Sequence, residues 1–271
     1  MTHPADLGAE FEQFAFPHAG RTHRVFRAGS GPGVVVIHEV PGLDPGVIGF
    51  GRRLIDAGYT VYLPSLFGRP GEGATAGAIV RSILRVCISR EFTILADRTS
   101  PIASWLRALA AAAYAECGGP GVGAVGMCLT GGFALAMAVQ PEVVAPVLSQ
   151  PGLPAPITAR KRAALGLDPA DLDVIDSRVR QGLCVLGLRF SNDRGCPAER
   201  FETLRHKLGA AFEGIEIDSS PGNPFGIPTS AHAVLTVSLV DQAGHPTRAA
   251  LDRVLAFLDE RLRPANPADP G

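Results

Sequence analysis

The chain has 271 residues, of which 46% are hydrophobic and 19% are charged. This composition is typical of a folded globular protein and argues against an intrinsically disordered one. Because 25 Lys and Arg nearly balance 26 Asp and Glu, the overall charge attracts neither nucleic acid nor an anionic membrane, and we expect neither as a partner.

Predicted strands alternate with predicted helices in the first half of the chain. The β-branched run over 33–39 is bounded by glycines and predicts a buried strand. A helix over 47–57 and a strand over 59–64 follow. Two further helices are expected over about 75–95 and 99–116.

The same alternation continues in the second half. A third strand over 121–127 precedes a helix over 131–140, and a fourth strand over 143–151 contains Pro146, which weakens its assignment. Residues 151–181 are polar and proline-rich at first and then helical. The remaining predicted elements are strands over 183–190 and 212–220 and helices over 197–209 and 246–262.

Strands that alternate with helices predict a mostly parallel sheet covered by helices on both faces, which is an α/β fold. No linker, composition shift or repeat divides the sequence. We therefore expect residues 1–271 to form a single domain. Its core would span about 20–262, with a flexible N-terminal arm and a flexible tail over 263–271.

The sequence has no pattern typical of secretion, membrane insertion or metal binding. Residues 1–14 lack the apolar core of a signal peptide, and a Pro-Glu pair interrupts the longest apolar stretch, 131–151. The five cysteines form no CxxC pair, their odd number argues against a disulfide framework, and no His/Cys spacing resembles a zinc site. We expect a cytoplasmic protein without metal or cofactor.

One cysteine, Cys128, lies in the glycine-rich stretch GMCLTGG after the third strand, and it allows three interpretations. The glycines at 121, 123 and 126 formally match the GxGxxG of a dinucleotide-binding loop, but that loop follows its strand, whereas these residues form the predicted strand. A cysteine in apolar surroundings is usually a small core residue, which is our interpretation of Cys87, Cys117 and Cys184.

The third interpretation of Cys128 is a nucleophile elbow, a strained turn between strand and helix. Gly126 lies two residues before Cys128, Thr130 lies two residues after it where a glycine is usual, and Gly131-Gly132 follows. Small residues let the backbone pass close to the turn. A cysteine at the start of a helix is also favoured as the thiolate. This pattern favours a cysteine nucleophile.

A nucleophile on such an elbow needs a base and an acid, which follow it in the order acid, histidine. The histidines after Cys128 are His206, His232 and His245. His206 lies in a charged helix and His245 at the start of the last helix, whereas His232 lies in a loop between the last strand and the last helix. His232 is therefore the predicted base.

Two aspartates are candidates for the acid. Asp193 follows the fifth predicted strand at the carboxyl edge of the sheet, and Asp218 ends the sixth. We select Asp193 and keep Asp218 as the alternative.

With these residues assigned, the sequence resembles the dienelactone hydrolase family of α/β-hydrolases over about residues 20–262. The matching segments in chain order are VVVIHEVPGL, LIDAGYTVYLPSLFGRPG, GMCLTGG, SNDRGCPAER, which fits a D-x-x-x-P pattern, and AHAVL. The resemblance implies an α/β-hydrolase fold. It also implies hydrolysis of a small carboxylic ester or lactone through a thioester acyl-enzyme.

The resemblance implies a role for each site residue. Cys128 would attack the carbonyl, His232 would accept the proton and later activate water, and Asp193 would fix the histidine tautomer. The backbone N–H groups of Leu129 and Val40 would form the oxyanion hole.

The residues around this trio carry further expectations. Glu39 would contact the resting cysteine and move as substrate binds; alternatively it pairs with an arginine at the sheet edge. Its neighbour His38 would hydrogen-bond the backbone. Thr236 stands where dienelactone-binding members of the family have an arginine for the substrate carboxylate, and Arg81 is a candidate to supply that cation.

The remaining expectations concern Cys196, the segment 151–181 and the class of function. Cys196 would be a small apolar residue, and 151–181 would reshape the mouth of the site. Two other functions stay open, a catalytically silent α/β-hydrolase that binds or senses a small molecule and a nucleotide-dependent oxidoreductase. The sequence predicts no oligomeric state.

Overall fold

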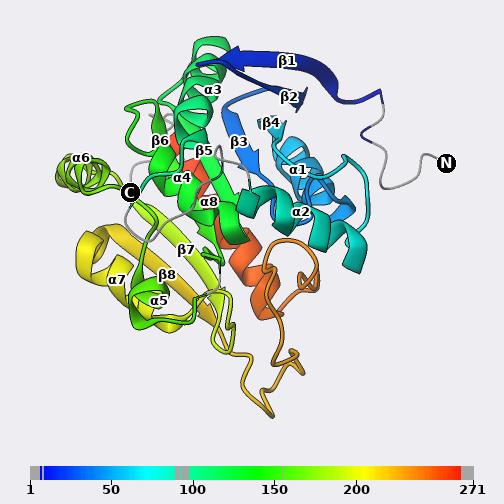
Figure 1. The fold of residues 1–271 in the computed structure, drawn as a ribbon, viewed down its shortest axis with the longest axis vertical. Helices are drawn as coiled ribbons and strands as arrows, with labels where there is room; N and C mark the ends of the chain where they lie inside the picture. The colour runs from blue at the N-terminus through cyan, green and yellow to red at the C-terminus, as the bar shows by residue number, and fades with distance from the viewer. Residues whose placement is uncertain (1–6, 8, 89–91, 93–97, 155, 264–271) are drawn as a thin grey trace.

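The computed structural model describes every residue except 1–6, 8, 89–91, 93–97, 155 and 264–271. Its centre is an eight-stranded sheet in the order β1-β2-β4-β3-β5-β6-β7-β8 (Figure 1). The strands are β1 Glu12–His18, β2 Arg21–Ala28, β3 Gly33–Ile37, β4 Thr60–Ser65, β5 Val122–Met127, β6 Val143–Ser149, β7 Val185–Phe190 and β8 Phe212–Ile217. The α-helices are α1 Pro45–Asp56, α2 Ala76–Ile88, α3 Ile102–Cys117, α4 Gly131–Met137, α5 Ala159–Ala163, α6 Pro169–Arg180, α7 Ala198–Leu208 and α8 Pro246–Leu262, with 3-10 turns η2 Cys128–Thr130 and η3 Gly209–Ala211.

The strands from β3 to β8 pair in parallel, whereas β2 is antiparallel to both β1 and β4. Parallel pairing brings the carboxyl ends of the central strands to one edge of the sheet. Ile37 at the end of β3 pairs with Gly126 of β5, and Ser149 at the end of β6 pairs with both Met127 and Leu188. Residues that directly follow these strands therefore lie close together.

Helices cover both faces of the sheet, because successive side chains of a strand point to opposite faces. In β3, Val35 and Ile37 belong to the core cluster that contains residues of α3, α4, α6 and α7. Val34 and Val36 belong to the opposite cluster, with residues of α1 and α8. The structure confirms the predicted α/β-hydrolase fold with a mostly parallel sheet between two helical layers.

Most predicted elements are present, and the differences have local causes. Helix α8 covers the predicted 246–262, with Pro246 at its first position, where the missing N–H costs nothing. Strand β6 forms in spite of Pro146, and its ladder with β7 begins only at Val147, after the proline. Gly123 and Gly126 lie inside β5, so the GxGxxG match is part of a strand and not a phosphate-binding loop.

The hairpin of β1 and β2 is absent from the sequence prediction, and it places Glu12–His18, part of the expected N-terminal arm, in the sheet. Its two-residue turn consists of Ala19 and Gly20, at φ values of 49° and 75°. Alanine rarely adopts this region, so the turn lacks the Asn-Gly or Asp-Gly signal that usually identifies a hairpin. The tail expected to be flexible lies outside the described residues except for Arg263.

The segment 151–181 contains the short helix α5 and the longer helix α6. The buried guanidinium of Arg200 on α7 donates hydrogen bonds to the carbonyl oxygens of Pro151 at 2.8 Å and of Lys161 and Ala164 at 2.7 Å. Arg162 of α5 also pairs with Glu199 of α7 at 2.8 Å. These bonds fasten the first part of the segment to α7.

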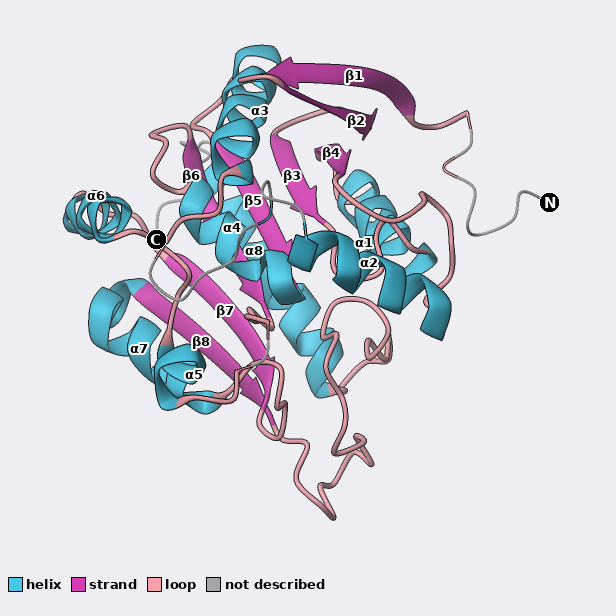
Figure 2. Cartoon of the chain, in the orientation of Figure 1, coloured by secondary structure: helices cyan, strands magenta, loops and turns pink. Residues whose placement is uncertain are grey.

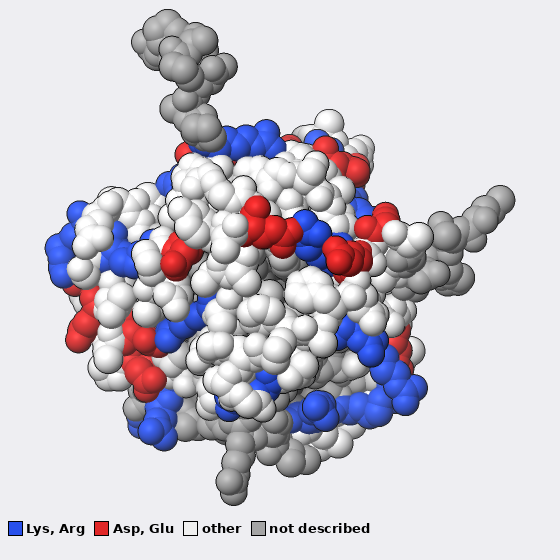
Figure 3. All heavy atoms as spheres, turned by 90° about the horizontal axis from the view of Figure 1, so that it is seen from above, with Lys and Arg blue, Asp and Glu red and all other residues white. Residues whose placement is uncertain are grey.

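The connection between β8 and α8, orange in Figure 1, contains no helix or strand (Figure 2). On the face shown in Figure 3, acidic and basic side chains are interspersed, in keeping with a net charge of −1. No helix in the described part of the chain is long and apolar enough to cross a membrane.

Candidate active site

Cys128 occupies a sharp turn between β5 and α4. It is the first residue of η2, and its φ of 55° lies in the left-handed region, which residues with a side chain rarely adopt. The close packing of this turn requires glycine. A Cβ at Gly126 would collide with the carbonyl oxygen of Thr130, and a Cβ at Gly131 would lie 2.6 Å from the Cα of Pro151. Strain of this kind persists where the surrounding structure enforces it, and it concentrates at functional sites.

Thr130, the departure from the usual glycine, stabilises the turn through its buried hydroxyl. The oxygen accepts the N–H of Met127 at 3.0 Å and lies within 2.8 to 3.1 Å of the carbonyl oxygens of Met127, Ile37 and His38. A hydroxyl has a single proton, so it donates to one of these carbonyls at a time. Thr130 thereby connects the elbow to the end of β3.

Asp193 and His232 form a hydrogen-bonded pair beside this turn. Asp193 follows β7, and its Oδ2 lies 2.7 Å from Nδ1 of His232. The other carboxylate oxygen, Oδ1, accepts the N–H of Gly195 at 2.8 Å. The Asp193 side chain is 4% exposed and that of His232 is 33% exposed. The carboxylate is thus held on both sides, and it orients the imidazole.

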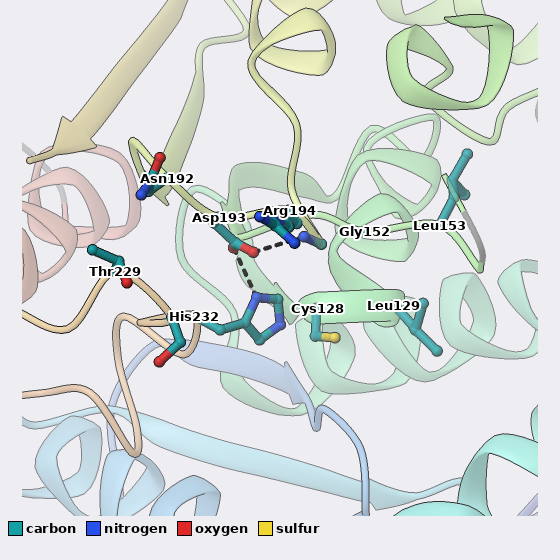
Figure 4. A pocket seen from close by; sticks show the side chains of 11 residues that line it. Cys128, Leu129, Gly152, Leu153, Asn192, Asp193, Arg194, Thr229 and His232 are labelled. Atoms are coloured by element: carbon teal, nitrogen blue, oxygen red, sulfur yellow. Dashed lines mark hydrogen bonds and ion pairs between the residues drawn. The ribbon is translucent and has the colours of Figure 1, made fainter. Parts of the chain in front are cut away.

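Asp193 and Cys128 raise the pKa of His232. Burial alone would lower it, but the hydrogen bonds to Asp193 and Cys128 and the electrostatic interactions with both raise the pKa to about 11. Figure 4 shows the imidazole of His232 between Asp193 and Cys128. An imidazolium in this place stabilises a neighbouring thiolate, which is the nucleophilic form of cysteine.

These residues line a cavity of about 580 Å³. This volume lies within the range of small-molecule sites. The lining consists of Cys128, Leu129, Gly152, Leu153, Asn192, Asp193, Arg194, Gly195, Thr229, Ser230 and His232 (Figure 4). The other candidates for acid and base lie elsewhere, since Asp218 lines a different cavity and His245 bonds Thr247.

Glu39 is buried at the end of β3, and its carboxylate has two hydrogen-bond partners. Oε1 accepts from the hydroxyl of Thr236, and Oε2 accepts from Nε2 of Gln150 at 3.2 Å. Burial raises the pKa of Glu39 and the nearby Asp44 adds to this, whereas Thr236, the charge of His232 and Gln150 lower it. Neither carboxylate oxygen of Glu39 is hydrogen-bonded to Cys128 among the described residues, and no described arginine pairs with it. The expected contact with the resting cysteine stays a prediction.

His38 is buried and its ring hydrogen-bonds the backbone, as predicted from the sequence. Its Nε2 accepts the N–H of Leu66 at 3.1 Å, so the proton is on Nδ1, which donates to the carbonyl oxygen of Glu39 at 2.9 Å. Burial lowers the pKa of His38 to about 4 and keeps the ring neutral.

Comparison with known proteins identifies the family of the chain. The sequence model of the dienelactone hydrolase family matches residues 22–226, which is more than half of the chain. The chain belongs to the dienelactone hydrolase family. None of the curated proteins matches it.

Solved structures of dienelactone hydrolases and related proteins share this fold. A Klebsiella pneumoniae protein named as a dienelactone hydrolase aligns with a TM-score of 0.63 and 19% identity, over 92% of this chain and 98% of its own. A dienelactone hydrolase-like promiscuous phosphotriesterase from metagenomic libraries gives 0.56 and 19%, over 93% and 98%. The dienelactone hydrolase of Anabaena variabilis gives 0.57 and 13%, over 94% and 100%.

Within this dienelactone hydrolase fold, the two backbone groups expected to form an oxyanion hole lie on different elements. Leu129 is the second residue of η2 and lines the cavity. Val40 follows β3, and its N–H has no hydrogen-bond partner among the described residues. Both positions agree with the order of elements in a nucleophile elbow.

The structure separates Arg81 from the cavity and brings a different arginine to it. Arg81 on α2 forms an ion pair with Glu72 and does not line the cavity beside Cys128. Arg194, which directly follows Asp193, is exposed and lines the cavity, and it has no ion pair with a described residue. Sequence reasoning missed Arg194, although its position next to the predicted acid was the available signal.

Cys196 is fully buried, and burial raises its pKa to about 12, which makes it an unreactive thiol. Among the described residues, no group of three or more His, Cys, Asp or Glu side chains could hold a metal ion.

Proposed function

We propose that the protein hydrolyses a small carboxylic ester or lactone through a thioester at Cys128. The observation that carries this proposal is the hydrogen bond between His232 and the buried Asp193, formed at the same cavity as a cysteine held at a φ of 55°. A nucleophile, a base and a group that orients the base are the three parts that covalent catalysis needs. Membership of the dienelactone hydrolase family supports the same class of reaction.

In the acylation step, the Cys128 thiolate attacks the carbonyl carbon and the carbonyl electrons move onto oxygen. The N–H groups of Leu129 and Val40 stabilise this oxyanion. When the tetrahedral intermediate collapses, the bond between carbon and the alcohol oxygen breaks, and His232 donates its Nε2 proton to the departing alkoxide. The products are the free alcohol and a thioester on Cys128.

In the deacylation step, neutral His232 removes a proton from water, and the hydroxide attacks the thioester carbonyl. Collapse of the second intermediate releases the carboxylic acid and restores the thiolate beside the imidazolium. Asp193 keeps the proton of the imidazole on Nδ1, so that Nε2 faces the reacting atoms in both steps. No metal or cofactor takes part in this scheme.

The lining of the cavity supports a small, partly polar substrate. Leu129 and Leu153 provide apolar contact, whereas Asn192, Thr229 and Ser230 can hydrogen-bond oxygen atoms. Arg194 would interact with an anionic substituent. Substrate binding by Arg81 stays a prediction from the sequence, and in the structure its guanidinium is paired with Glu72.

An enzyme fits these residues better than a silent binding protein, because a binding module has no need for an imidazole oriented by a buried carboxylate. The cytoplasmic location inferred from the sequence is part of the proposal.

Substitution of the nucleophile tests the proposed function. We expect Cys128→Ala to abolish hydrolysis of activated aryl esters and lactones by the purified protein, whereas Cys117→Ala, on α3, leaves it unchanged. Mass spectrometry of wild-type protein quenched during turnover should show an acyl group on the peptide that contains Cys128. Full activity of Cys128→Ala would disprove the assignment.

A further inference from the structure

Gln150 is a buried polar residue to which the proposed mechanism gives no role. It follows β6 at the sheet edge that also carries Cys128 and Asp193, and its side chain is fully buried. Its φ of 36° lies in the left-handed region, and its N–H donates to the carbonyl oxygen of Leu188 at 2.6 Å. A residue with a side chain keeps such a conformation only where its contacts require it.

The side-chain amide of Gln150 connects three separate segments of the chain. Its Oε1 accepts the N–H of Val234 at 3.2 Å and the hydroxyl proton of Ser149, while its Nε2 donates to Oε2 of Glu39 at 3.2 Å. Because the backbone N–H of Val234 can only donate, the atom facing it must be the amide oxygen. The NH₂ group therefore faces Glu39, and the orientation of the amide is fixed.

The same network holds the loop that carries His232. Val234 lies two residues after His232 and bonds Gln150, and Thr236 lies four residues after it and bonds Glu39. Gln150 and Glu39 are bonded to each other, so the loop is attached to the ends of β6 and β3 at two successive points. The charged groups around the Glu39 carboxylate are His232, which favours its ionised form, and Asp44, which opposes it.

We propose that Gln150 is a positioning residue, which holds the imidazole of His232 at Cys128 by bonding the Val234 N–H and the Glu39 carboxylate at once. Gln150 touches no reacting atom and acts through the loop. This inference rests on the proposed function, because it assigns Gln150 to the pair formed by His232 and Cys128. It predicts that the geometry of this pair loosens when the amide is replaced.

The test uses Gln150→Met, which keeps the length of the side chain and removes the amide. We expect kcat for an activated ester to fall roughly 10-fold to 100-fold with KM within about two-fold, because a small displacement of a catalytic group affects chemistry more than binding. Loss of the Gln150 donor also removes a bond that lowers the pKa of Glu39. Glu39 then stays neutral to higher pH and stabilises the imidazolium less.

Alkylation of Cys128 by iodoacetamide measures the weaker stabilisation of the imidazolium through its effect on the thiolate, and this measurement needs no ester substrate. Counting only the label on the Cys128 peptide, we expect the pH midpoint of alkylation to move upward in Gln150→Met. Gln181→Met, an exposed glutamine at the end of α6, is the matched control and should leave both measurements at wild-type values. Unchanged kcat and an unchanged midpoint in a folded Gln150→Met protein would overturn the proposal.

Gln150→Glu keeps the shape of the side chain. It tests the positioning role within a single variant, because pH changes whether the new side chain can donate a hydrogen bond. Its carboxyl can donate to Glu39 only while protonated, so activity relative to wild type should decrease as pH rises. A purely structural role predicts a loss that does not vary with pH, and that result would contradict the proposal. If wild-type protein hydrolyses no ester, the proposed function fails, but the alkylation midpoints of the variants still decide the role of Gln150.

Discussion

Asp193 uses both of its carboxylate oxygens, one for the N–H of Gly195 and the other for Nδ1 of His232. The backbone bond restrains rotation of the carboxylate and so helps to keep Oδ2 facing Nδ1 of the imidazole. The surrounding space is also filled, since a Cβ on Gly195 would lie 3.1 Å from Cε1 of His232. The aspartate thus sets the histidine tautomer through geometry as well as through charge.

Asp193→Asn should therefore reduce kcat by orders of magnitude while leaving the fold intact. The Asn amide can donate to Nδ1, which then carries no proton, and Nε2 would point its proton at Cys128 instead of accepting one. The loss for a comparable triad is roughly 10⁴-fold. Asp218→Asn, which removes an exposed carboxylate bonded to Ser220, should retain full turnover. If the two variants exchanged these results, Asp218 would be the acid.

At the scale of elements, the turn from β5 through η2 into α4 joins two regular elements without a loop. It can do so because glycine stands at 126 and 131, where neighbouring backbone approaches most closely. The amide of Gly152 donates a hydrogen bond of 2.8 Å to the carbonyl oxygen of Cys128, so the segment that follows β6 supports the turn from outside.

Gly126→Ala should destabilise the protein and displace the cysteine. The added methyl collides with the Thr130 carbonyl, and overpacking at such a site costs about 1–3 kcal/mol. Gly49→Ala in α1 is the control, because a Cβ there meets only the end of Arg53 at 3.8 Å. This substitution should stabilise the protein by about 0.4–1 kcal/mol. Thermal unfolding and the alkylation rate of Cys128 measure both effects. A Gly126→Ala protein with wild-type stability and reactivity would contradict this account of the elbow.

The residues of the site differ in how far the sequence could predict them. Cys128, Asp193 and His232 each have a local signal, namely a glycine-rich turn, a carboxylate directly after a strand and a histidine in the last loop. Gln150 has none, because its partners Glu39 and Val234 are 111 and 84 residues away in the chain. The hydrogen bonds of Glu39 were missed for the same reason, since only folding brings the ends of β3 and β6 against the histidine loop.

At the scale of the molecule, the eight strands of the described residues belong to one continuous sheet. The site lies at the carboxyl edge of that sheet, where Cys128 follows β5, Asp193 follows β7 and the loop after β8 brings His232 beside them. A charge at the site is therefore coupled to folding as a whole.

This coupling predicts that His232 makes stability depend on pH. Its pKa in the folded protein is raised from 6.5 to about 11, so the folded state binds the proton more tightly than the unfolded state. The stabilisation is complete below pH 6.5 and decreases as pH rises toward 11. Urea midpoints should show wild type losing its advantage over His232→Gln across this range, while exposed His206→Gln follows wild type. A constant difference between wild type and His232→Gln would disprove this effect.

The three carbonyl bonds of Arg200 have a consequence for which molecules can react. They hold the backbone at Pro151 and at the end of α5, and Gly152 and Leu153, which directly follow Pro151, form one wall of the cavity. A wall supported in this way resists displacement by a bulky substrate. Selection among substrates on this side then depends on their fit to a fixed surface, and substitution of Arg200 is a change that would widen it.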